Sequence, residues 1–143
     1  MSSVRTWERN ENELNLFVEA QELAIYILKT TQNEKIFKRE FKVEITDKIV
    51  SLSTNIYLNL WKANNCKLES NERRKYQHLA IMNCVDLLAM WNLGIRAFHL
   101  KSKKTKYVVG KVIAIRDTTK KWINNDIDRL KQLNNIENEA VKP

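Results

Sequence analysis

Basic side chains crowd the last third of this 143-residue chain. Residues 101–131 carry ten basic and three acidic side chains, whereas residues 1–100 carry 14 basic and 12 acidic ones. Charge gathered on one element builds a directed field that attracts polyanions, of which nucleic acid is the commonest in a cell. The pattern therefore predicts a phosphate-binding surface. The alternative is a solvated helix face whose lysines bind nothing specific.

The residue types indicate how such a surface would bind. Lysines outnumber arginines by eight to two in residues 101–131, and lysine is a flexible point charge rather than the planar fork that suits guanine. We therefore expect phosphate contacts with little sequence preference and a steep salt dependence. Tyr107 would stack on a base. The residues predicted to bind nucleic acid are Lys101, Lys103, Lys104, Lys106, Tyr107, Lys111, Lys120, Lys121 and Arg129.

One cation of this segment stands apart from the others. Arg116 falls inside the apolar stripe of the predicted helix, where an unpaired charge would be costly. Asp86, at the margin of the preceding helix's stripe, is its predicted partner in a buried ion pair. The alternative is that Arg116 faces a water-filled channel in an oligomer.

One catalytic motif is present. Arg73 and His78 have the Arg-x4-His spacing and resemble in this respect the small all-helical ribonucleases of prokaryotic toxin and defence systems. His78 would act as the general base, and Arg73 would stabilise charge on the phosphate. Two residues at a tolerant spacing arise easily by chance in a chain rich in lysine and arginine. We therefore expect a non-enzymatic protein and keep the ribonuclease as an alternative.

Other site chemistries lack their residues. Neither histidine has a Glu three positions before it, which excludes the Glu-x-x-His pairs of a di-iron bundle. Gly94 and Gly110 are the only glycines, so there is no glycine-rich phosphate loop and no nucleophile elbow. Cys66 and Cys84 have no partner at metal-ligand spacing. We expect reduced thiols and neither a metal nor a cofactor.

The elements that must position these residues are helices. The chain has two glycines and one proline, its last residue, so it lacks the turn residues of an all-β fold. Apolar residues at three- and four-residue spacing predict helices over residues 11–31, 39–64, 71–100 and 103–134, followed by a frayed tail. Short polar connections favour an antiparallel, up-down-up-down four-helix bundle, one all-α domain over residues 1–143.

The third predicted helix is apolar around more than half of its circumference. Ile81, Val85 and Leu88 widen its stripe beyond what a lone bundle covers, which predicts a homo-oligomer. Scattered exposed aliphatic side chains are the alternative. The polar N-terminal stretch has no secretory signal, and polar residues interrupt the best apolar window, 76–95. We therefore expect a cytoplasmic protein with no membrane partner.

Four short stretches carry a family resemblance. They are residues 16–24 (LFVEAQELA), residues 35–38 (KIFK) ahead of 45–49 (ITDKI), and residues 98–103 (FHLKSK) before the basic final helix. Over residues 14–134 their order and texture resemble a small four-helix-bundle family. That family includes the accessory variability determinant of diversity-generating retroelements and the proteins encoded within 23S rRNA intervening sequences.

The resemblance implies a function as well as a fold. The accessory determinant is a non-enzymatic, ring-like homopentamer with a basic surface, which binds its element's reverse transcriptase and RNA and assists mutagenic cDNA synthesis. By resemblance we expect a pentamer whose partners are a reverse transcriptase and RNA or DNA. A pure protein–protein scaffold is a further alternative.

Overall fold

The computed structural model describes residues 2–141, with side chains from residue 15 onward. Its elements are α1 (Ser2–Thr31), η1 (Arg39–Phe41), η2 (Lys42–Thr46), α2 (Asp47–Asn64), α3 (Asn71–Phe98) and α4 (Ser102–Val141). Here η1 is a 3-10 turn and η2 a π-helical turn. This part of the chain contains no strand, and the predicted all-α four-helix bundle is confirmed.

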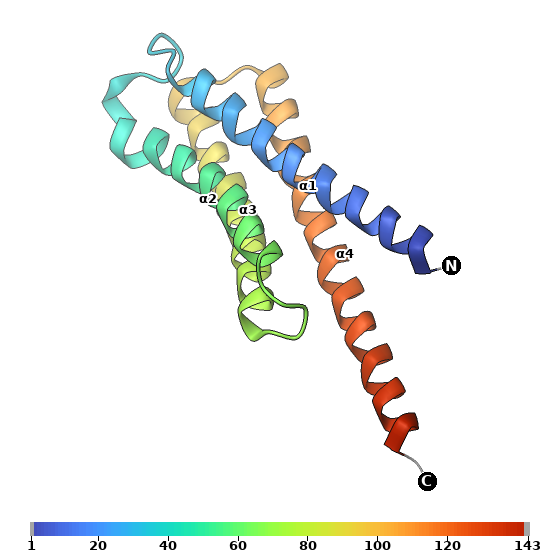
Figure 1. Cartoon of the computed structure of the whole chain (residues 1–143). Coiled ribbons are helices and arrows are strands. Elements are labelled where there is room, and N and C mark those ends of the chain that lie inside the picture. Colours follow the sequence, from blue (N-terminus) through green and yellow to red (C-terminus); the bar gives the residue numbers. More distant parts are fainter. Residues whose placement is uncertain (1, 142–143) are drawn as a thin grey trace.

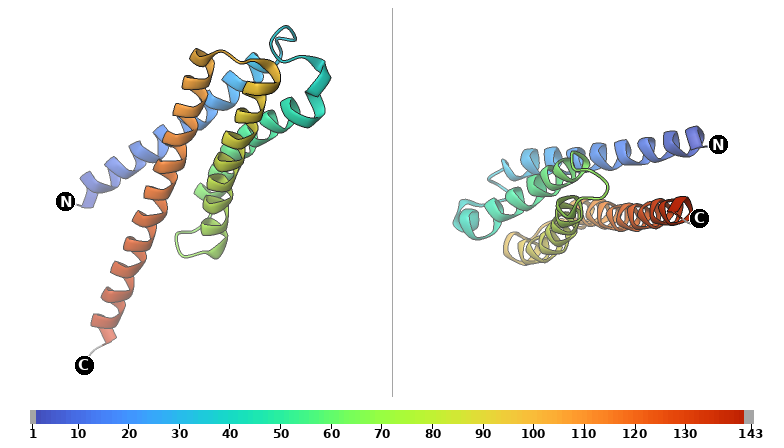
Figure 2. Two further views of the ribbon diagram at one scale, coloured as in Figure 1. Left: turned by 180° about the vertical axis from the view of Figure 1, so that it is seen from behind. Right: turned by 60° about the horizontal axis from the view of Figure 1, so that its bottom comes forward.

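Consecutive helices run in opposite directions (Figure 1). α2 and α3 form a closely packed hairpin, α1 lies against α2 and α4, and α4 also packs on α3. The α1–α2 and α3–α4 connections lie at one end of the bundle, and the α2–α3 loop lies at the other. Figure 2 shows that the N-terminal part of α1 and the C-terminal part of α4 extend beyond the α2–α3 hairpin.

Each helix buries one stripe at three- and four-residue spacing, as an amphipathic helix must. On α3 the stripe runs from Ala80 through Cys84 and Leu87 to Trp91, all at most 1 % exposed. A fully buried Leu or Ile contributes about 1.5–3 kcal/mol, so these stripes hold the bundle together. The other large buried side chains include Leu23, Ile27, Ile49, Ile56, Leu60, Val108, Val112 and Ile115.

The ends of α3 are fixed by local hydrogen bonds. The Ser70 hydroxyl caps the N-terminus by accepting the Arg73 backbone N–H at 3.2 Å. At the C-terminus His99 adopts the left-handed conformation with φ 55°, and its N–H donates to the Ile95 carbonyl. This reversal leaves only three residues between α3 and α4, which brings the start of α4 beside the end of α3.

Several helix boundaries differ from the prediction. α1 begins at Ser2 instead of residue 11, and α4 continues to Val141 instead of ending at residue 134 in a frayed tail. Neither extension contains Gly or Pro, so nothing in the sequence stops the helix. The predicted second helix is interrupted, because residues 39–46 form η1 and η2 before α2 begins at Asp47.

Among the described helices, α3 is long and apolar enough to cross a membrane, although the sequence interpretation expected no such segment. A buried core helix passes the same test of length and composition, and α3 supplies one of the core stripes. The length and composition of α3 are therefore only weak evidence for a membrane span.

Candidate nucleic-acid interface

Cations from the two connections and from the first two turns of α4 lie at one end of the bundle. The Phe37 and Phe98 rings, from the α1–α2 connection and the end of α3, have centroids 5.4 Å apart, so the two connections lie side by side (Figure 1). Among the described side chains, six lysines there form no ion pair, and five of them are exposed while Lys104 is half-buried. We call this surface the basic end, and it comprises Lys35, Lys38, Lys101, Lys103, Lys104 and Lys106.

Carboxylates neutralise two other cations of the α1–α2 connection. Arg39 Nε lies 3.2 Å from Glu34 Oε1, and Lys42 Nζ lies 4.0 Å from Asp47 Oδ1. These exposed pairs each contribute at most about 1 kcal/mol to stability. They nevertheless reduce the field of the α1–α2 connection, so the α4 lysines dominate the charge of the basic end.

The predicted binding residues further along α4 divide into two groups. Lys111 donates to Glu22 Oε2 on α1 at 2.9 Å, and this hydrogen bond raises the pKa of Lys111. Arg129 NH1 lies 3.7 Å from the buried Asp126. Lys120 and Lys121 are exposed and form no ion pair with any described side chain. Of these four residues, only Lys120 and Lys121 therefore have charges that are free to bind phosphate, as the charge pattern predicted.

Tyr107 is less accessible to a base than predicted. Its ring packs against Tyr26 of α1 with centroids 4.4 Å apart, and the residue is 39 % exposed. Lys111 Nζ lies 5.9 Å from the Tyr107 ring centroid. Tyr26 therefore occupies one side of Tyr107, which leaves at most the other side for stacking.

The predicted pair of Arg116 and Asp86 does not form. Arg116 Nε donates instead to the adjacent Asp117 at 3.1 Å, with 28 % of the Arg116 side chain exposed. Asp86 is exposed on α3 and lines a groove next to α2. The long arginine side chain reaches past the apolar stripe to water, so no buried partner is required.

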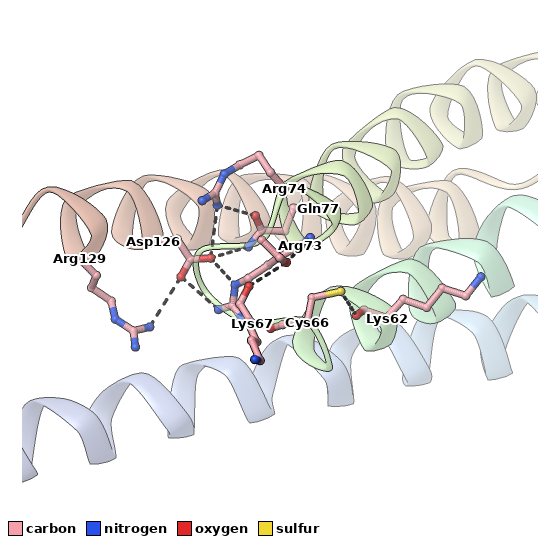
Figure 3. A network of polar contacts seen from close by, with 9 residues as sticks. Lys62, Cys66, Lys67, Arg73, Arg74, Gln77, Asp126 and Arg129 are labelled. Atoms are coloured by element: carbon pink, nitrogen blue, oxygen red, sulfur yellow. Dashed lines mark hydrogen bonds and ion pairs between the residues drawn. The ribbon is translucent and has the colours of Figure 1, made fainter. Parts of the chain in front are cut away.

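The buried charge pair lies elsewhere, between α3 and α4 (Figure 3). Asp126 is fully buried and accepts two hydrogen bonds from Arg73, from Nε at 2.7 Å and from NH2 at 3.1 Å. Gln77 Nε2 donates to the same carboxylate at 2.9 Å, and Arg74 NH1 donates at 3.4 Å. Burial of a carboxylate is tolerated when it is paired and hydrogen-bonded in this way.

The Arg73 guanidinium makes two further contacts. Arg73 NH1 donates to the Cys66 carbonyl at 3.2 Å, and the group lies 4.9 Å from the Trp122 ring centroid. The side chain thus ties the α2–α3 loop to α4. This geometry makes Arg73 a structural residue that joins three elements.

The ribonuclease motif is split by the same arrangement. Arg73 is buried against α4, whereas His78 is exposed. Five residues along a helix correspond to a rotation of about 140°, so the two side chains leave α3 in different directions. A phosphate next to His78 would not meet the Arg73 guanidinium in this geometry.

Both cysteines are free thiols, as expected. Burial raises the pKa of Cys84 to about 12, an effect that the nearby Arg116 charge partly opposes. Within the described residues, no three His, Cys, Asp or Glu side chains gather where they could hold a metal ion.

Comparison with known proteins bears on the fold. No family model and no curated protein match the sequence. A crystal structure of a protein of unknown function from the S23 ribosomal protein family of Bacteroides thetaiotaomicron is similar, with a TM-score of 0.69. The match covers 79 % of this chain and 98 % of that chain, at 13 % identity. It shows a shared fold, consistent with the 23S intervening-sequence group that the sequence resembles.

The sequence interpretation missed Asp126, although a signal was present. Asp126 continues the row formed by Val108, Val112, Ile115, Thr119 and Trp122, which is the buried stripe of α4. Arg73 and Gln77 occupy the corresponding stripe of α3. A carboxylate in one stripe and a guanidinium in the other are the pattern of a buried pair between helices.

Proposed function

We propose that this protein is a non-enzymatic, oligomeric accessory protein that binds nucleic acid at its basic end and works with a reverse transcriptase. The observation that carries the proposal is the group of six lysines that have no carboxylate partner among the described side chains, brought together from the two connections and the first two turns of α4. A concentrated positive field of this kind favours a phosphate chain. The reverse transcriptase and its retroelement come from the family resemblance alone.

The lysines at the start of α4 are placed well for phosphate contacts. Lys101, Lys103 and Lys106 are exposed within six residues, at the point where the chain enters α4. Free backbone N–H groups in the first turn of a helix add partial positive charge there. Phosphate oxygens would therefore meet both side-chain and main-chain donors.

Two exposed apolar faces support self-association. On α1 and α2 the large exposed side chains are Val18, Ile25, Leu28, Leu58 and Trp61, each 40–47 % exposed. On α3 a second row includes Met82, Val85 and Leu93, each 51–59 % exposed. A subunit with separate exposed apolar faces suits self-association, and a closed ring such as the pentamer of the family is one product.

Nucleic-acid binding is tested by fluorescence anisotropy with labelled single-stranded RNA and DNA. Six phosphate contacts predict a salt slope of about −4, so affinity should fall by two to three orders of magnitude between about 50 and 200 mM salt. Lys103→Glu with Lys106→Glu should abolish binding at the higher salt. The matched control, Lys62→Glu with Lys67→Glu, makes the same charge change at exposed positions outside the basic end. Flat salt dependence, or equal loss in both variants, would contradict the proposal.

The other functions give different results in the same system. RNA that is cut by wild-type protein and left intact by His78→Ala would establish the ribonuclease instead. Absence of any nucleic-acid affinity, together with stable capture of one protein partner, would establish a scaffold. Co-expression with any reverse transcriptase that is encoded beside this gene, followed by co-purification, tests the partner.

A further inference from the structure

The last three turns of α4 carry apolar side chains that their own bundle does not cover. Residues 131–141 are all exposed, and Leu133 and Ile136 are 49 % and 61 % exposed. With Ala140 they have a spacing of three and four residues, so they share one helix face. We call residues 131–141 the α4 arm. At a rise of 1.5 Å per residue, the arm is about 16 Å long.

A largely apolar groove lies between α2 and α3. Its volume is about 390 Å³, and its lining residues are Lys48, Ser51, Leu52, Asp86, Ala89 and Met90. Ala89 also belongs to the outward row of α3, with Met82 and Val85 before it and Leu93 after it. This row spans 12 residues, or about 18 Å at the same rise, which is close to the length of the arm.

The charges of the two surfaces are complementary. Glu137 and Glu139 are the only charged residues of the arm beyond Lys131. Lys48 borders the groove, and Lys75 and Arg96 are exposed on α3 before and after the apolar row, against the single carboxylate of Asp86. An acidic arm that carries an apolar stripe therefore fits a mostly basic rim around an apolar floor.

The arm and the groove of one chain do not meet. α4 extends away from the α2–α3 hairpin beyond the bundle, as both views in Figure 2 show. A continuous helix cannot fold back on itself, so another copy must supply the contact. We infer that the α4 arm of one subunit lies in the α2–α3 groove of a second copy of this chain. The inference rests on the oligomer in the proposed function and names its contact.

The contact has a defined type of symmetry. An arm that meets a groove joins two different surfaces, so each subunit gives one arm and receives another. Such a head-to-tail contact closes into a ring or continues as an open chain. Removal of apolar area on both surfaces from water drives the association.

Cross-linking of full-length protein tests the contact directly. Ile136→Cys and Ala89→Cys are made in separate Cys66→Ser chains, mixed in equal amounts and oxidised. Cys84 is fully buried and its thiol stays protonated, so it does not compete. We expect a disulfide-linked heterodimer at least ten times as abundant as with Asn138→Cys, which lies on the opposite face of the arm. Equal yields would overturn the inference.

Assembly measured on the unmodified chain gives a second, independent test. Leu133→Glu with Ile136→Glu should reduce the mass from light scattering to that of a monomer without changing the helical circular-dichroism signal. Acidic variants that assemble like wild type, or a wild-type protein that is monomeric, would overturn the arm contact. Salt-dependent RNA binding is measured on the same samples. RNA binding that persists in the acidic variant would leave the basic end intact as a binding surface. RNA binding that is absent from the wild-type protein would refute the basic end as a binding surface, but not the arm contact.

Discussion

Replacing Asp126 by Asn tests the buried network that joins α3 to α4. Asp126 is fully buried and accepts four hydrogen bonds, two of them from Arg73, which is itself only 6 % exposed. The substitution keeps the size of the side chain and removes its charge. Arg73 is then a buried cation without a counter-ion. The new amide N–H groups also face the N–H donors of Arg73 and Gln77, with which they form no hydrogen bond.

The size of the effect follows from the geometry. Removing one partner of a buried ion pair costs about 3–5 kcal/mol, a large share of the 5–15 kcal/mol typical of a domain. For a chain of this length we expect the melting temperature to fall by roughly 10–20 °C. Urea unfolding followed by circular dichroism, at one fixed protein concentration, measures the change in free energy.

A paired variant separates the charge from the packing. In Arg73→Met with Asp126→Leu both buried charges are gone, so this double variant should be more stable than Asp126→Asn alone. Arg74 is partly exposed and can turn to water in both variants. A loss below about 1 kcal/mol in Asp126→Asn would refute the buried-pair reasoning, since it would mean that water already reaches the network.

Three further predictions concern single residues. The folded-state pKa of Cys84, about 12, lies above the unfolded value of 9.0. The stabilisation by the protonated thiol is therefore fully present below pH 9 and is lost as the pH rises toward 12. At pH 10.5 the free energy of unfolding, measured in urea, should have fallen by about 2 kcal/mol more than in Cys84→Ala. Gly110→Ala should add about 0.5–1 kcal/mol in the same assay, because no atom lies within 4 Å of the new Cβ and helical Gly is unfavourable. His99→Gly should raise the melting temperature by a few degrees, since glycine accepts the left-handed conformation without strain; no rise would contradict this.

The four helices could be predicted from the sequence because each carries a periodic apolar stripe that is local in the chain. The stripe Ala80, Cys84, Leu87 and Trp91 lies within one helix, so its period is visible without a partner. The ends were less predictable. Nothing in residues 2–10 or 135–141 stops a helix, and the exposure of residues 135–141 is a tertiary fact.

The candidate site was predictable only in part. Local crowding of lysines at the start of α4 is a sequence property, and these residues are exposed in the structure. The partners of Lys111 and Arg73 are 89 and 53 residues away, at Glu22 and Asp126. Contacts at such separations depend on how the helices pack, which a single sequence does not specify.

The amino-acid sequence by itself determined the helical class, the number of helices and the total charge of the last third, because periodicity and composition act through near neighbours. Tertiary structure decided which cations stay open and which are neutralised. It also turned Arg73 inward and left the α4 arm uncovered. The physical reason is that ion pairing and burial depend on distance in space, and the relative rotation of two packed helices sets that distance.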